Sequence, residues 1–68
     1  MKIGEKEQKI RDRVIFVYNV IPQVIDVDRH VVYVELRQKD VERLNLSLED
    51  IANDLGAFVD RKVEVKAK

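Results

Sequence analysis

The sequence predicts a small α+β domain in which one helix packs on a small antiparallel sheet, with the elements in the order β-β-β-α-β. Three observations lead to this prediction. Residues 14–21 are almost all β-branched or aromatic, and two further apolar runs follow within residues 24–37. A capped amphipathic segment then begins after Ser47 and precedes a last alternating run. β-Branched and aromatic residues favour strands, whereas apolar residues three and four positions apart favour a helix.

The apolar run at residues 14–21 has the length of a strand and contains one polar residue. Side chains alternate between the two faces of a strand, so both faces of this one are apolar. We therefore expect a central strand that is covered on both faces, or covered on one face by a second copy of the chain. Ile15, Val17 and Ile21 share one face and are the predicted partner-binding residues. Pro22 ends the strand because it cannot donate a ladder hydrogen bond.

Residues 24–27 and 31–37 are the next two predicted strands, and Asp28 opens the turn between them. The second strand alternates, which predicts one face in the core and one face partly in water. The first three strands would then form an antiparallel meander. Between residues 38 and 46 we expect a short turn of helix that places Val41 and Leu44 against the sheet.

The predicted helix begins after Ser47, whose side chain can cap the first turn, and ends at Gly56, which suits the left-handed position after a helix. Its apolar residues recur at i, i+3, i+4 and i+7 and define one packed face. The last strand spans residues 58–66, and its lysines suit a sheet edge because edge charges discourage pairing with other chains. The predicted core consists of Phe16, Tyr18, Val32, Val34, Leu36, Leu48, Ile51, Leu55, Val63 and Val65.

Length and composition favour self-association. A chain of 68 residues without cysteine has no disulfide to support its small core, so we expect a homodimer. Residues 1–13 are a charged N-terminal tail or a short helix, and residues 14–68 form a single α+β domain. We expect a cytoplasmic protein without a membrane segment, since no apolar run approaches the ~20 residues of a membrane span. Charged residues make up 38% of the chain, against about 25% in an average domain, which suggests a thermophilic source.

The formal net charge is zero, but the two ends of the chain are basic and the middle is acidic. Residues 1–13 carry five positive and three negative side chains, and residues 61–68 carry four and one. Basic segments can bind a phosphate backbone, which provides an alternative reading as a nucleic-acid-binding protein. The candidate nucleic-acid-binding residues are Lys6, Lys9, Arg11, Arg13, Arg61, Lys62, Lys66 and Lys68.

Catalytic chemistry has little support in this sequence. The chain has one serine, which is the predicted helix cap, and one histidine, and it has no glycine-rich phosphate loop. Asp26, Asp28 and His30 alternate along a predicted strand and turn, so they are remote candidates for a metal-dependent hydrolase site. Asp28 is better explained as a turn former. We therefore expect no enzymatic activity and no cofactor.

Ala52 and Gly56 lie four positions apart in the capped helix, a spacing that resembles the first helix of a helix-turn-helix DNA-binding motif. The resemblance covers about ten residues and implies a recognition helix near residues 59–68. Those residues instead alternate and are rich in valine, which predicts a strand. The acidic outer face of the helix also suits a phosphate backbone badly.

Two functional hypotheses follow from the sequence. The first is a small non-enzymatic interaction module that acts through a protein partner or through self-association. The alternative is a small nucleic-acid-binding regulator that uses the basic N- and C-terminal segments. Clustering of the basic residues on one face would favour nucleic acid, and dispersal among acidic residues would favour a protein partner.

Overall fold

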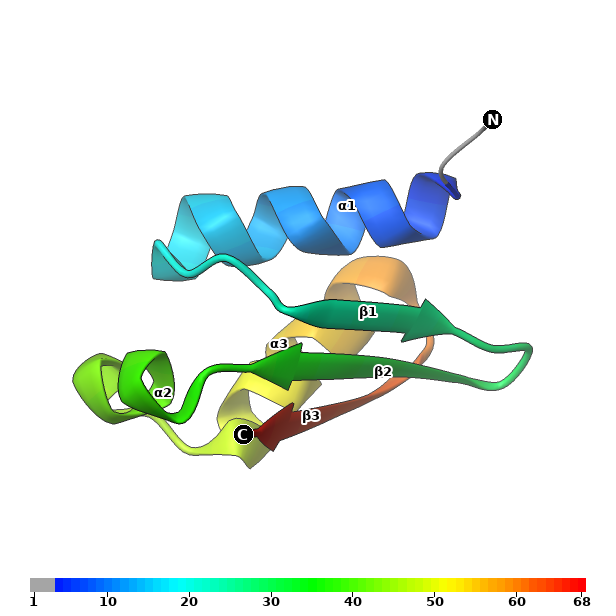
Figure 1. The fold of residues 1–68 in the computed structure, drawn as a ribbon. Helices are drawn as coiled ribbons and strands as arrows, with labels where there is room; N and C mark the ends of the chain where they lie inside the picture. The colour runs from blue at the N-terminus through cyan, green and yellow to red at the C-terminus, as the bar shows by residue number, and fades with distance from the viewer. Residues whose placement is uncertain (1–3) are drawn as a thin grey trace.

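The computed structural model describes residues 4–68 as a small α+β fold built on a three-stranded mixed sheet (Figure 1). The order along the chain is α1 (Glu5–Arg13), the π-helical turn η1 (Val14–Tyr18), β1 (Val24–Val27), β2 (Val31–Leu36), α2 (Gln38–Leu44), α3 (Leu48–Val59) and β3 (Lys62–Ala67). Helix α3 crosses one face of the sheet, and α1 lies along β1 and against α3. The α+β class is therefore confirmed, but the order β-β-β-α-β with a single helix is wrong.

The predicted central strand at residues 14–21 is a helix and a turn. Helix α1 continues without a break into η1 and ends at Asn19, which adopts the left-handed conformation with φ of 57°. Ile10 and Val14 are four positions apart, so they lie on one helical face, and both are fully buried. Asparagine tolerates the left-handed position, and proline commonly follows a helix end. Asn19 and Pro22 are therefore the termination signals of a helix, and packing has overridden the β propensity of the run.

The hairpin prediction is confirmed. Strands β1 and β2 are antiparallel, with Val24 opposite Glu35 and Val27 opposite Val32. In the turn, the Asp28 carboxylate accepts a hydrogen bond of 2.7 Å from the Arg29 backbone N–H. Strand β3 pairs in parallel with β2, because α2 and α3 return the chain to the end of the sheet at which β2 begins. The sheet is therefore mixed rather than antiparallel, and β3 lies at its edge, as predicted.

Helix α3 begins where the sequence predicts and ends later. The Ser47 hydroxyl accepts a hydrogen bond of 3.1 Å from the Asp50 backbone N–H, which confirms the cap. Gly56 lies inside the helix rather than after it, and Asp60 takes the left-handed position with φ of 54°. A Cβ atom at Gly56 would lie 3.0 Å from the Arg61 carbonyl oxygen, so glycine allows the chain to fold back tightly toward β3. Helix α2 is the predicted short helical turn.

The core lies between the sheet and the helices on one of its faces. Seven predicted core residues are buried: Val32, Val34, Leu36, Ile51, Leu55, Val63 and Val65. Tyr18 and Leu48 are partly buried against this core, whereas Phe16 is 90% exposed and was wrongly placed there. The core also contains three residues that the sequence did not predict there: Ile10, Val14 and Val20. Helix α1 packs on β1 and α3 and takes the place of the expected central strand. The other face of the sheet carries the exposed Val24 and Tyr33.

Candidate functional site

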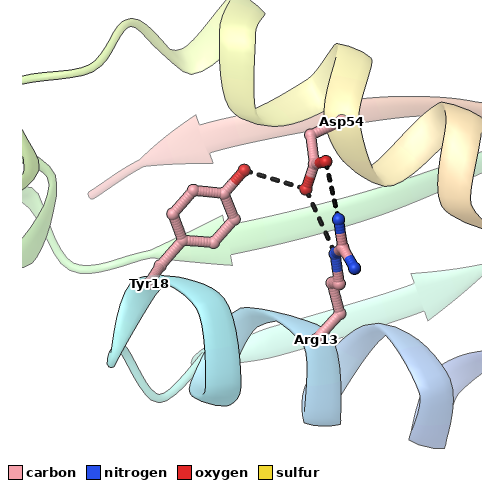
Figure 2. Close-up of polar contacts among 3 residues, drawn as sticks. All are labelled: Arg13, Tyr18 and Asp54. Atoms are coloured by element: carbon pink, nitrogen blue, oxygen red, sulfur yellow. Dashed lines mark hydrogen bonds and ion pairs between the residues drawn. The ribbon is translucent and has the colours of Figure 1, made fainter.

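A polar cluster of Arg13, Tyr18 and Asp54 ties the first helical segment to α3 (Figure 2). The Arg13 guanidinium donates to the Asp54 carboxylate through Nη2 at 3.0 Å and through Nε at 3.4 Å. The Tyr18 hydroxyl donates to the same carboxylate at 2.9 Å. Arg13 and Tyr18 are five positions apart, across the π-helical turn. Both side chains bind Asp54, which lies 36 or more positions away in the sequence.

The pKa shifts in this cluster favour the charged forms of Asp54 and Arg13 and the neutral form of Tyr18. The pKa of Asp54 is lowered, first by the hydrogen bond from Arg13 and also by the one from Tyr18. Burial, followed by the hydrogen bond to Asp54, raises the pKa of Tyr18 to about 12. The hydrogen bond to Asp54 also raises the pKa of Arg13. At neutral pH the carboxylate is charged and the phenol keeps its proton, so the cluster acts as a structural brace and is poorly suited to proton transfer.

An apolar hollow of about 290 Å³ opens beside this brace. Lys9, Asp12, Arg13 and Phe16 line it from the first helical segment, and Phe58 lines it from α3. The Arg13 guanidinium carbon lies 4.8 Å from the centre of the Phe58 ring, a cation–π distance. Arg13 is therefore held by Asp54 on one side and by an aromatic face on the other. The hollow is formed by residues of two helical segments rather than by a loop.

Three apolar residues of η1 are exposed, and one of them, Phe16, lines this hollow together with Phe58 of α3. Ile15, Phe16 and Val17 are 40%, 90% and 47% exposed, and Phe58 is 45% exposed. We call Phe16 and Phe58 the helical apolar surface, because both line the hollow. Ile15 and Val17 are predicted partner-binding residues, but they lie on a helix and not on a strand, on the two sides of Phe16, and neither lines the hollow. Phe16 and Phe58 were missed because the strand assignment turned Phe16 inward and helix α3 was ended too early.

The third predicted partner-binding residue, Ile21, lies apart from this surface. It is 64% exposed and contributes to a second hollow of about 280 Å³ between the segment after η1 and helix α2. Arg37, Asp40 and Arg43 supply the charged groups of that second hollow. Arg43 is paired with Asp40 at 2.8 Å. The structure therefore separates all three predicted residues, which a flat strand would have placed on one face, because Ile15 and Val17 are two positions apart on a helix.

The basic residues proposed for nucleic-acid binding are divided between two elements. Lys6, Lys9, Arg11 and Arg13 belong to α1, which lies along β1, whereas Lys62 and Lys66 belong to β3 at the opposite edge of the sheet (Figure 1). Arg61 and Lys68 flank β3. Two arginines of the set already have partners: Arg13 binds Asp54, and Arg61 donates to the Asp28 carbonyl oxygen at 3.0 Å.

Asp26, Asp28 and His30 lie on β1 and the following turn, and all three are exposed. The Asp28 side chain is occupied by the turn hydrogen bond from Arg29. Within residues 4–68, no group of three or more histidine, cysteine, aspartate or glutamate side chains is arranged to hold a metal ion. Nor is any helix in this described part of the chain long and apolar enough to cross a membrane.

Comparisons of the chain with protein-family models, with curated proteins and with solved structures found no match.

Proposed function

We propose that this protein is a non-enzymatic interaction module that docks an apolar, acid-flanked helix of a protein partner on its helical apolar surface. The exposure of Phe16 carries the proposal, since this ring is 90% exposed while smaller residues fill the core. Burial of a phenylalanine side chain is worth about 1.5–3 kcal/mol. An exposed aromatic ring beside a second ring and an apolar hollow is the arrangement expected of an interaction anchor.

The rigidity of the site supports a docking role. Arg13, which forms one wall of the hollow, is held by Asp54 and by the Phe58 ring, so this wall is in place before a partner binds. Preorganised walls lower the ordering cost of association. Two helices with a hollow between them also match the mode in which an amphipathic helix lays its apolar face in a groove.

The charges around the hollow indicate the chemistry of the partner. Lys6, Lys9 and Arg13 are at i, i+3 and i+7 on α1, in the helical row that leads to Phe16. Lys9 and Arg13 line the hollow together with a single acid, Asp12. Acidic side chains on the rim of the partner would complement this row and steer its approach.

The placement of the basic residues favours a protein partner over nucleic acid. Duplex binding needs several cations that reach phosphates along one surface. Helix α1 and strand β3 instead lie at opposite sides of the sheet, and the strand lysines alternate with Glu64.

The proposal is tested with a synthetic 18-residue amphipathic helix that carries leucine on one face and glutamate on its flanks. We expect fluorescence anisotropy to show saturable binding, and Phe16→Ser to weaken the binding about tenfold, because one phenyl ring no longer leaves water. Val24→Ser is the matched control, since it removes an exposed apolar side chain from the far face of the sheet. This control should bind as the wild type does.

Two results would overturn the proposal. One is equal binding of a peptide with lysine flanks, which would show that the row on α1 has no role. The other is an amide NMR titration in which a short DNA duplex shifts residues 6–13 and 61–68 together and added salt weakens the shifts. The second result would favour the nucleic-acid-binding regulator.

A further inference from the structure

The free edge of β3 is the feature that the proposed docking function does not use. Strand order is β1-β2-β3, so within the described residues 4–68 no strand pairs with the outer side of β3. Every second residue of an edge strand points its backbone N–H and C=O groups out of the sheet, and these groups form a template for another strand. The direction of these groups along β3 can be worked out from its last hydrogen bonds.

Lys68 shows which backbone groups of β3 face β2. Its N–H donates to the Leu36 carbonyl oxygen at 2.9 Å, and its own carbonyl oxygen accepts from the Gln38 N–H at 3.0 Å. Backbone direction alternates along a strand, so Glu64 and Lys66 also bond to β2. The N–H and C=O groups of the intervening residues therefore point outward: Val63, Val65 and Ala67.

The side chains of β3 alternate between the two faces of the sheet. Val63 and Val65 point into the core, and Lys62, Glu64 and Lys66 stand on the open face of the sheet. Charges on an edge strand normally discourage pairing. Here the signs alternate as plus, minus and plus, so the effect depends on the register in which a second strand approaches.

We propose that two copies of this chain pair antiparallel along β3, with Val65 opposite Val65 of the second copy, to form a continuous six-stranded sheet. In this register Glu64 faces Lys66 of the second copy, and Lys66 faces its Glu64. Val63 faces Ala67 on the core side. All the outward backbone groups of Val63, Val65 and Ala67 are then paired across the two-fold axis.

Two other registers are less favourable. A shift that centres the axis on Glu64 places Glu64 opposite its own copy and Lys62 opposite Lys66, so like charges meet at every position on the open face. A shift that centres it on Val63 places Asp60 and Arg61 in the pairing, and these residues belong to the turn between α3 and β3. The register centred on Val65 uses the whole strand and brings opposite charges together at its middle.

The first test follows the oligomeric state and amide exchange of the intact chain. Sedimentation equilibrium from about 10 µM to 1 mM should show a monomer–dimer equilibrium. Amide hydrogens of Val63, Val65 and Ala67 should become protected as the concentration rises, whereas that of Lys68 is protected throughout. A monomer at every concentration would overturn the proposal. So would a dimer that leaves the exchange of these three amides unchanged.

The second test uses charge reversals on the open face of β3, where a changed side chain does not disturb the core. Glu64→Lys or Lys66→Glu places two like-charged pairs across the axis and should weaken the dimer about tenfold. The double variant restores both pairs and should recover the wild-type dissociation constant. Failure of the double variant to recover it, with the fold intact by circular dichroism, would overturn the register.

Lys62→Glu is a matched control with the opposite expected sign. In the proposed register Lys62 faces Lys68 of the second copy, so reversal of its charge should tighten the dimer severalfold. A weaker dimer would indicate the register centred on Val63 and would contradict the proposed one. Phe16→Ser should leave the dimer unchanged. Loss of the dimer in that variant would place self-association on the helical apolar surface and overturn the pairing through β3.

Discussion

Replacement of Asp54 by asparagine is the sharpest test of how α3 holds the first helical segment. The carboxylate accepts hydrogen bonds from Arg13 at 3.0 Å and from Tyr18 at 2.9 Å. The side chains of the ion pair are 34% and 32% exposed, so solvent screens it and its contribution is small. The partly buried hydrogen bond from Tyr18 contributes about 1 kcal/mol more.

Asp54→Asn should therefore lower the free energy of unfolding by roughly 1–2 kcal/mol at pH 7 and the Tm by on the order of 10 °C. Urea unfolding measures the first quantity and thermal unfolding the second. The pKa of Asp54 is lowered in the folded state, so its contribution is present above the unfolded pKa of about 3.9. It is lost as the pH falls through the folded value, and wild type and variant should then converge in stability.

A double-mutant cycle with Tyr18→Phe isolates the hydrogen bond. We expect Tyr18→Phe to cost about 1 kcal/mol in the wild type and much less in an Asp54→Ala background, which leaves the hydroxyl without this acceptor. Asp12→Asn is the control, because its exposed carboxylate accepts a hydrogen bond from Gln8 on the same helix and should change the stability by less than about 0.5 kcal/mol. Equal costs of Tyr18→Phe in both backgrounds would refute the assignment of the brace.

Two further predictions concern single side chains. In a Tyr33→Phe variant, whose only tyrosine is Tyr18, ultraviolet absorption of the phenolate should show a midpoint near 12, because burial and the hydrogen bond to Asp54 raise the pKa. Since the folded pKa lies above the unfolded value of about 10, the stability linked to this proton is complete below pH 10 and is lost between pH 10 and 12. A midpoint near 10 in the folded variant would contradict this geometry. Ser47→Ala should cost about 1 kcal/mol in urea unfolding, because the Asp50 N–H loses its 3.1 Å partner, whereas Ser47→Asp should be nearly neutral.

Residues 14–21 show why the sequence prediction failed at one point. The run consists of strand-forming residues, and its alternation leaves both faces apolar. The helical interpretation requires Ile10 to be considered together with Val14, and Asn19 to be read as a left-handed helix end. Those signals are present in the sequence, but only the packing of α1 on β1 and α3 makes them stronger than the local propensity.

The candidate site was predictable in part for the same reason. Ile15 and Val17 are exposed, since an apolar run too rich for one buried face leaves some side chains outside in either conformation, and their role in partner binding stays a prediction. The sequence does not predict the roles of Phe58 and Asp54. Their roles depend on contacts with Arg13 across 41 or more positions, and nothing in the local pattern of α3 marks them.

By itself, the sequence determined the elements whose signals are local: the Asp28 turn and its hairpin, the Ser47 cap, and the alternating edge strand with its valines inward. Capping, turn formation and strand alternation depend on neighbours within about four positions, so a single chain read in order contains them. Only the tertiary structure decided that the first apolar run is helical, that β3 runs parallel to β2, and that Phe16 is left in water beside Phe58. These outcomes depend on which distant surfaces meet, because a helix and a strand of the same apolar residues differ in stability mainly by the area that each can bury.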